Sequence, residues 1–368
     1  MKTIKIGFVG VGAISSIYLE NITNLFKEVE IIGVCDLIRE RAEKAVELYN
    51  IPKLYNDMYE LFADPEVDIV LNITRPYEHF DVTMAALNAG KHVYSEKPLA
   101  ATLDEGRQIM ALAKEKGLMV GGAPDTFMGA GIQTCRKLIE DGYIGEIIGA
   151  NAQMLCHGHE TWHPDPEFYY KHGGGPLFDM GPYYITALVN LIGNVDTVYS
   201  MTKRAYDRRT ITSTPHFGET IDVDVDTHIV GTLRFDSGAV ATLITSFDTY
   251  IWRNAIEIYG TKGTLYVPDP NCFDGPVKLY RPEDGEIREV PLTFRYKDNS
   301  RTLGLADMAK ALTTGRKYRA CSDMTFHVLE IMEGLLTSGK ERREVAIESR
   351  FEKKAIMEVP DMMGILEA

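Results

Sequence analysis

The sequence predicts two domains: an α/β domain with a doubly wound parallel sheet, and an α+β domain with an open, mainly antiparallel sheet. Strand and helix patterns alternate over residues 1–122. Later in the chain, two glycine-containing turns, at 236–238 and 260–263, each separate a pair of strand patterns. The length of 368 residues is enough for two hydrophobic cores. We therefore expect one domain at 1–122 and a second at 123–368.

The strand patterns of the first domain are apolar almost throughout, and they lie at 4–9, 30–35, 67–73, 92–95 and 118–121. Apolar residues recur at helical spacing between them. A helix near 80–89 is expected to end at Gly90, and a capping box that begins at Thr102 predicts a helix ending near Gly117. Strands this apolar are covered on both faces, which is typical of parallel sheets.

A glycine turn, Gly10-Val11-Gly12, joins the first strand to the first helix. Gly10 permits a tight turn, and Gly12 lets a pyrophosphate approach the backbone at the helix start, where Ala13 and Ile14 follow. Ser15 replaces the third glycine of the dinucleotide-binding fingerprint. The position predicts a Rossmann domain that binds a nicotinamide nucleotide. The alternative is a glycine turn that binds no nucleotide.

Asp36 ends the second predicted strand, where a carboxylate would accept hydrogen bonds from the adenosine ribose diol. This predicts NAD as the cofactor. A 2′-phosphate would be repelled by Asp36, although Arg39 and Arg41 could partly compensate, so NADP remains possible.

Two further segments follow predicted strands, and ligands bind at the carboxyl ends of strands in open α/β sheets. Thr74, Pro76 and His79 come after the third strand and are expected near the cofactor, although His79 could instead cap or pack the next helix. Glu96-Lys97-Pro98 comes after the fourth strand. Pro98 restricts the backbone of Lys97, so we expect an ammonium group directed into a cleft and a cis Lys97–Pro98 bond. The alternative is a surface lysine. Glu96 points the opposite way and is expected to be a cofactor or structural partner.

The second domain begins with a crossing segment that contains Asp125, which we include among the substrate-binding residues. Residues 156–171 then combine three histidines, a tryptophan, two adjacent tyrosines and prolines. Aromatic rings with polar edges suit a polyhydroxylated ligand, which predicts that His157, Trp162 and His163 bind substrate. A purely structural aromatic loop and a zinc site are the alternatives; no metal is expected, since no acidic partner has obvious spacing.

Asp179 and Tyr183 are four residues apart and share a face if this segment is helical. Pro182 indicates either a helix that begins near it and runs to Leu191, or a distorted helix. Beyond it, residues 227–235 pair with 239–247 and 255–259 pair with 264–267 as predicted hairpins. Helices are expected at 303–313 and 322–338, and one sheet face is expected to be available for a partner subunit.

The composition limits the function classes. A net charge of −14 argues against nucleic-acid or anionic-membrane partners. The five cysteines are scattered and odd in number, which favours a reduced, cytoplasmic protein. Neither a signal sequence nor an apolar run near 18 residues is found in the sequence.

With these motifs in order, nearly the whole chain resembles the Gfo/Idh/MocA oxidoreductases, the family of glucose–fructose oxidoreductase and inositol dehydrogenase. The resemblance rests on Gly10-Val11-Gly12, Thr74-Arg75-Pro76 with His79, Ala89–Val93 leading to Glu96-Lys97-Pro98, and Gly173–Tyr184. It implies a bound nicotinamide nucleotide, a catalytic lysine at Lys97, a catalytic-segment aspartate at Asp179, and a carboxyl-terminal sheet that often forms dimers or tetramers. Many members have histidine four residues after that aspartate; this chain has Tyr183, as the glucose–fructose oxidoreductase-like members do.

The resulting hypothesis is reversible hydride transfer between a secondary alcohol of a sugar, sugar derivative or cyclitol and NAD(P). Lys97 would stabilise the developing alkoxide, and Tyr183 would exchange the proton, with Asp179 or a histidine as alternatives. A tyrosine pKa of about 10 requires lowering by a neighbouring ammonium for this role. Two other functions are compatible with the same fold: a glycoside hydrolase that oxidises its sugar transiently with NAD, and a non-enzymatic sugar or nucleotide sensor.

Overall fold

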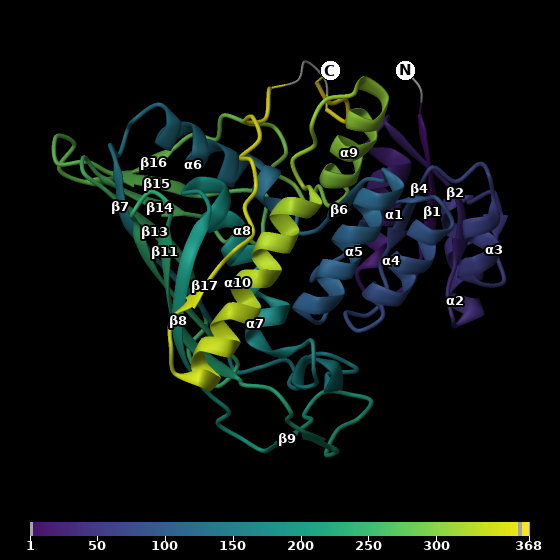
Figure 1. The fold of residues 1–368 in the computed structure, drawn as a ribbon, viewed down its shortest axis with the longest axis horizontal. Helices are drawn as coiled ribbons and strands as arrows, with labels where there is room; N and C mark the ends of the chain where they lie inside the picture. The colour runs from purple at the N-terminus through teal and green to yellow at the C-terminus, as the bar shows by residue number, and fades with distance from the viewer. Residues whose placement is uncertain (1–2, 360–362, 368) are drawn as a thin grey trace. The chain divides into compact units, whose positions relative to one another are not determined.

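The computed structural model describes residues 3–359 and 363–367, and it divides into two compact units (Figure 1). Unit 1 comprises Met1–Gly129, Phe294–Phe326 and Glu352–Ala368, and unit 2 comprises Ala130–Thr293 and His327–Phe351. Residues 1, 2, 360–362 and 368 of the predicted domains lie outside the described residues. The predicted domains, 1–122 for cofactor binding and 123–368 for substrate binding and oligomerisation, were defined by role, and this division stays a prediction.

The sheet of unit 1 is parallel, and its described strands follow the order β3-β2-β1-β4-β5-β6. Its strands are β1 (Ile4–Val9), β2 (Val29–Cys35), β3 (Lys53–Leu54), β4 (Ile69–Asn72), β5 (His92–Ser95) and β6 (Val120–Gly122). Every residue of β4 is buried, although successive side chains point to opposite faces. Both faces of the sheet are therefore covered, which confirms the predicted doubly wound sheet. Because the strands are parallel, their carboxyl ends lie at one edge.

The helices that connect these strands are α1 (Ser15–Asn24), α2 (Arg39–Tyr49), α3 (Met58–Ala63), α4 (His79–Asn88) and α5 (Leu103–Lys116). Four of them were predicted, whereas α3 and strand β3 were not. The capping box is confirmed: Thr102 Oγ1 accepts from the Glu105 backbone N–H, and the Glu105 carboxylate accepts from the Thr102 N–H. Gly117 follows the helix in the left-handed conformation, and Gly90 does so after α4.

Unit 1 also contains helix α9 (Leu303–Thr314), the short η1 (Thr126–Met128) and the first residues of α10 (Ser322–Glu341). Helix α9 packs on β6, and it comes close to the sheet at Gly304. A Cβ at this position would lie 2.2 Å from the Tyr94 hydroxyl. The absence of a side chain at Gly304 therefore lets the helix pack closely on the sheet.

The sheet of unit 2 follows the order β16-β15-β14-β13-β7-β12-β11-β8-β17 among the described residues. Its strands are β7 (Ile147–Leu155), β8 (Val195–Lys203), β11 (His228–Phe235), β12 (Val240–Ser246), β13 (Arg253–Gly260), β14 (Thr264–Val267), β15 (Val277–Tyr280), β16 (Ile287–Val290) and β17 (Val345–Ala346). Neighbours are antiparallel except for β7 and β12. Both predicted hairpins are confirmed. Strands β9 (Arg208–Thr210) and β10 (Thr220–Asp222) form a separate antiparallel pair.

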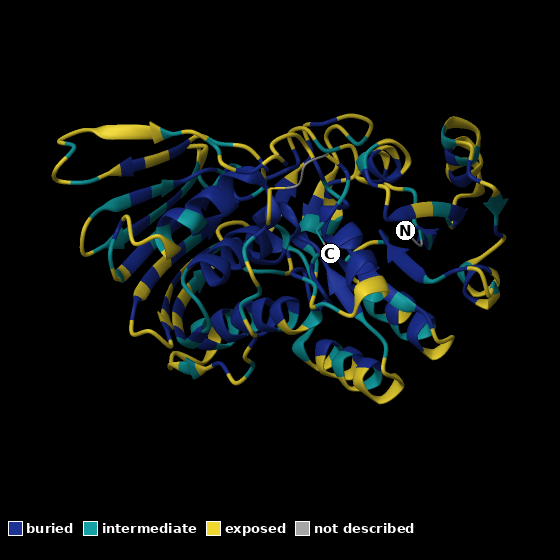
Figure 2. Ribbon diagram, turned by 90° about the horizontal axis from the view of Figure 1, so that it is seen from above, coloured by how far each residue is buried: buried dark blue, intermediate teal, exposed yellow. Residues whose placement is uncertain are grey.

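Burial alternates along the strands of the larger sheet, which Figure 2 shows as alternating blue and yellow. The buried face is covered by helices α6 (Ala130–Glu140), α7 (Gly175–Asp179), α8 (Gly181–Leu191) and the later part of α10. The other face is exposed: Met201 on β8 pairs with Val230 on β11, and Tyr199 pairs with Thr232. The short η2 (Glu167–Tyr170) precedes α7.

None of the described helices is both long and apolar enough to cross a membrane.

Candidate active site

The glycine turn of unit 1 is closely fitted on one side and open on the other. Gly10 has φ +91°, and a Cβ there would lie 2.8 Å from the Ile73 carbonyl oxygen. Only glycine therefore fits against the end of β4. At Gly12, by contrast, a Cβ would have no atom of the described residues within 4 Å. Ser15 closes the turn, because its hydroxyl donates to the Gly12 carbonyl at 2.7 Å.

These features fit a pyrophosphate. Gly12, Ala13 and Ile14 are exposed or partly exposed, and within the described part of the chain no side chain caps the start of α1. The Ser15 N–H donates to the Gly12 carbonyl at 3.1 Å, but the exposed backbone just before α1 is open to an anion, which the helix dipole also favours. The predicted cofactor contacts of Gly10, Gly12, Ala13 and Ile14 remain predictions that this geometry permits.

Asp36 lies at the end of β2, next to the glycine turn. Its Oδ2 accepts from the Val11 backbone N–H at 2.5 Å, and its Oδ1 accepts from the Ile38 N–H at 2.7 Å. The carboxylate therefore connects the two strand ends at which a dinucleotide would lie. Arg41 is exposed on α2, which begins two residues earlier at Arg39.

The turn after β4 is organised by a buried asparagine that the sequence patterns did not single out. Asn72 Oδ1 accepts from the Thr74 hydroxyl at 2.6 Å, and its Nδ2 donates to the His79 carbonyl at 3.1 Å. Thr74 and Pro76 remain partly exposed. A buried amide at a strand end, where an apolar residue would be expected, was the available signal.

His79 is fully buried rather than open to a ligand. Its Nδ1 lies 2.7 Å from the Pro98 carbonyl oxygen, and its Nε2 lies 3.1 Å from the Thr74 carbonyl oxygen. Burial lowers the pKa of His79. A neutral ring, which carries one N–H, can donate to only one of these two carbonyls. His79 thus connects the turn after β4 to Glu96-Lys97-Pro98 after β5. This is a structural role, in line with the alternative that His79 packs instead of binding a ligand.

Lys97 follows β5 and is partly exposed, and the predicted cis Lys97–Pro98 bond is confirmed. Glu96 is buried beneath it. Its carboxylate accepts from the Tyr18 hydroxyl at 2.5 Å and from the Lys97 backbone N–H at 2.9 Å. The structural role predicted for Glu96 is therefore present: its carboxylate links helix α1 to the backbone of Lys97.

Asp125 has an exposed fraction of 1%, and its Oδ2 accepts from the backbone N–H groups of Thr302 and Gly304, both at 2.9 Å. The carboxylate thus binds the amino-terminal end of α9. Burial raises the pKa of Asp125 to about 6. We therefore leave this residue out of the proposed substrate site.

In unit 2, Asp179 ends α7 and Tyr183 lies in the first turn of α8, on either side of Met180. Pro182 occupies an early position of α8, where its missing N–H costs no hydrogen bond, and α8 runs to Leu191 as the first alternative predicted. Asp179 is partly exposed and Tyr183 is buried.

The histidine contacting Asp179 is one that the sequence patterns did not select. His159 Nε2 lies 3.1 Å from Asp179 Oδ2, and the Trp162 indole nitrogen lies 3.2 Å from His159 Nδ1. Three histidines lie in this loop, and their spacing does not indicate which one reaches a residue 20 positions later.

The two predicted histidines make other contacts. His157 stacks on Tyr250 with ring centroids 3.9 Å apart, and His163 Nδ1 accepts from the Asp165 backbone N–H at 3.0 Å. Burial lowers the pKa of His163. The Trp162 side chain is exposed. Among the described residues, no three histidine, cysteine, aspartate or glutamate side chains lie together so that they could hold a metal ion.

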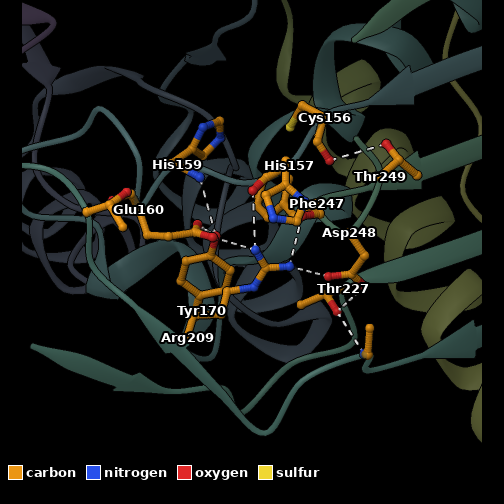
Figure 3. A network of polar contacts seen from close by, with 12 residues as sticks. Cys156, His157, His159, Glu160, Tyr170, Arg209, Thr227, Phe247, Asp248 and Thr249 are labelled. Carbon is orange, nitrogen blue, oxygen red and sulfur yellow. Dashed lines mark hydrogen bonds and ion pairs between the residues drawn. The ribbon is translucent and has the colours of Figure 1, made fainter. Parts of the chain in front are cut away.

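A buried arginine fixes the backbone of this loop (Figure 3). Arg209 Nη1 donates to Glu160 at 2.6 Å and to the His157 carbonyl at 3.3 Å, while Nη2 donates to the Phe247 carbonyl at 2.8 Å and to Asp248. The Tyr170 hydroxyl donates to Glu160. The guanidinium is thus paired with two carboxylates, which compensates for its burial.

The chain is similar to known proteins in both of the units described above. Residues 4–122 match the family described as "Oxidoreductase family, NAD-binding Rossmann fold", and residues 132–266 match the GFO/IDH/MocA C-terminal domain. Inositol 2-dehydrogenase of Salmonella typhimurium is 35% identical over 153 residues, covering 40% of this chain and 44% of that enzyme. The match therefore spans less than half of that enzyme's length.

Two more distant proteins are similar over most of their length. Myo-inositol 2-dehydrogenase of Thermotoga maritima is 28% identical over 301 residues, covering 80% of this chain and 84% of that enzyme. The solved structure of levoglucosan dehydrogenase in complex with NADH has a TM-score of 0.83 at 20% identity, covering 95% of this chain and 100% of that one. At that identity, the likeness shows the shared fold.

The two family matches follow one another along the chain and together cover most of it, on the parallel-sheet unit and the mixed-sheet unit described above, so the chain belongs to the Gfo/Idh/MocA oxidoreductase family with its NAD-binding Rossmann fold.

Proposed function

We propose that this protein is a dehydrogenase that transfers hydride reversibly between a secondary alcohol of a sugar, sugar derivative or cyclitol and NAD. Membership of the oxidoreductase family supports the reaction type. The names of its relatives, inositol dehydrogenases among them, support the substrate class. NADP is the second possible cofactor, and Asp36 is the reason for preferring NAD.

The observation that carries the proposal is the placement of Lys97 after β5 in the same parallel sheet whose β1 ends at the open glycine turn. One sheet edge thus has both an open, uncapped helix amino-terminus and an ammonium group. Such an edge suits a dinucleotide and the oxygen of an alcohol.

Bound NAD supplies the hydride acceptor. Lys97 binds the reacting oxygen and stabilises the alkoxide charge that develops as the proton leaves. Tyr183 exchanges that proton, and Asp179 orients the substrate. Trp162 packs against the sugar ring, while His157 and His163 bind neighbouring hydroxyl groups. Asp125 and His79 are left out of the ligand contacts because each is fully buried with its polar atoms bound to backbone groups.

We also propose that the protein is cytoplasmic and assembles as a homodimer or homotetramer through the exposed face of the larger sheet. Tyr199, Met201 and Val230 contribute large apolar side chains to that face. The net charge of −14 supports the absence of nucleic-acid and anionic-membrane partners.

The test is a panel of sugars, anhydrosugars and inositols assayed with NAD, with formation of the reduced cofactor followed by absorbance. Oxidation of at least one member is expected. Aryl glycosides are assayed in parallel without added nicotinamide. Hydrolysis of these, with no net cofactor reduction by the panel, would replace the proposal with a transient-oxidation glycoside hydrolase. Cofactor binding without turnover in either assay would instead favour a sensor.

A further inference from the structure

We propose that His159 is a positioning residue that holds the Asp179 carboxylate by a hydrogen bond in the orientation needed in the active site. The inference rests on the proposed function and adds to it a residue that neither the motifs nor the spacing of the loop identifies. It is carried by the contacts of one imidazole ring with Trp162 and Asp179, and all three residues lie in unit 2.

The hydrogen bonds define which tautomer of His159 is present. An indole N–H is only a donor, so the His159 Nδ1 atom that it contacts at 3.2 Å must be an acceptor. The ring proton is therefore on Nε2, which donates to Asp179 Oδ2 at 3.1 Å. A chain of donors runs from Trp162 through His159 to the aspartate. In this arrangement the bonded oxygen of Asp179 is a pure acceptor, and the other oxygen is oriented by it.

The ring has little freedom to leave this geometry. Tyr169 and Phe247 pack against it with centroid distances of 4.2 and 4.6 Å, and the exposed fraction of the His159 side chain is 9%. Asp179 is more accessible, at 14%. The buried imidazole therefore holds the more accessible Asp179 carboxylate from the protein interior.

The backbone that carries His159 is fixed as well. The residues on either side along the loop, His157 and Glu160, are both bound by Arg209 (Figure 3). The His159 backbone N–H donates to the Tyr170 hydroxyl at 3.3 Å, and its carbonyl accepts from the N–H groups of Trp162 and His163. An imidazole held by packing and by backbone contacts can maintain the direction of a catalytic carboxylate through turnover.

The experiment compares two substitutions at this position. His159→Leu removes the donor to Asp179, whereas His159→Gln retains an N–H donor near the position of Nε2. We expect kcat of H159L to fall on the order of 10²-fold because the carboxylate loses its orientation, with the Kd for NAD unchanged. H159Q should recover most of the loss. The same substitutions at the exposed His216 should leave kcat unchanged. Wild-type kcat in H159L, or equal losses in H159Q and H159L, would overturn the inference.

A second measurement does not depend on turnover. Nuclear magnetic resonance of the histidine ring nitrogens, with the H159Q spectrum identifying the His159 signals, should show an unprotonated Nδ1 and a protonated Nε2. A protonated Nδ1 would overturn the inference even if H159L is slow. If the wild type oxidises no substrate of the panel, the proposed function fails, while these spectra still test the His159 assignment.

Discussion

Asp36 accepts the backbone N–H of Val11 at 2.5 Å, so the acid that predicts NAD is also part of the glycine turn. This double role determines how the coenzyme prediction should be tested. Removing the whole side chain would disturb the turn and the charge together. Asp36→Asn retains one oxygen that can accept from the Val11 N–H; it removes the negative charge and the acceptor for the Ile38 N–H.

We expect the wild type to bind NAD more tightly than NADP. In Asp36→Asn, the Kd for NADP should fall by about tenfold, an effect of about 1.4 kcal/mol, because the 2′-phosphate no longer faces a carboxylate. Titration calorimetry with both nucleotides measures this. Asp141→Asn removes a surface carboxylate in unit 2 and serves as the control. A wild type that prefers NADP would refute the assigned role of Asp36.

Tyr183 and Tyr184 are adjacent and both buried at the start of α8, so they form a matched pair of substitutions. Tyr183→Phe should lower kcat on the order of 10²-fold or more, because a positioned acid or base is lost. It should also remove one limb of the pH–rate profile. Tyr184→Phe should change neither, since the Tyr184 hydroxyl has no hydrogen-bond partner among the described residues. An unchanged profile in Tyr183→Phe would transfer the proton-exchange role to Asp179 or a histidine.

Local sequence patterns were enough to predict much of this fold. Strands β1, β2, β4, β5 and β6 were predictable because each belongs to a short, largely apolar run, and both hairpins had turn residues of the right kind. The two-residue strand β3 and the short helix α3 were not predicted. Strand β8 was missed, although alternating burial at Val195, Val198 and Ser200 provided a weak signal. Helix α9 was predicted as a helix, but its packing on β6 is a long-range contact that sequence order does not indicate.

The candidate site was less predictable than the fold because its contacts join distant residues. Lys97, Asp179 and Tyr183 stood out by position and spacing, and their catalytic roles came from the family resemblance. Asp125 was predicted to bind substrate, yet it binds the end of α9, a contact between residues 177 positions apart. His159 contacts Asp179 only because the loop folds back, and Arg209 stabilises that loop from a strand far along the chain.

His327 makes the stability of unit 2 depend on pH. Its Nε2 accepts from the Val195 backbone N–H at 3.0 Å, and burial lowers its pKa from 6.5 to about 4. The folded state therefore binds this proton less readily than the unfolded state does. The stabilisation is present above pH 6.5 and is lost as the pH falls toward 4.

His327→Gln should remove this dependence. The stability difference between wild type and His327→Gln should shrink by about 3 kcal/mol between neutral pH and pH values below 4, as judged by urea unfolding. His216→Gln, at an exposed position, should give parallel curves at all pH values. A constant difference between wild type and His327→Gln would show that His327 does not titrate differently on unfolding.

The exposed face of the larger sheet provides the fourth prediction. Met201 is 70% exposed at the centre of β8, opposite Val230. If this face joins subunits, Met201→Asp should convert the oligomer to a smaller species, because a carboxylate cannot be buried there unpaired. Light scattering measures the mass. Leu48→Asp, at an exposed apolar position on α2, should leave the mass unchanged. A monomeric wild type would contradict the proposed assembly.

Lys97→Met tests the central claim most directly, because it removes the ammonium while keeping an unbranched side chain of similar length. Turnover and the Kd for NAD are measured together, with Lys262→Met, an exposed lysine in the β13–β14 hairpin, as the control. The proposed role predicts that kcat falls on the order of 10²-fold or more while NAD still binds, because the charge stabilising the alkoxide is absent. Retention of most of the activity by Lys97→Met would contradict it.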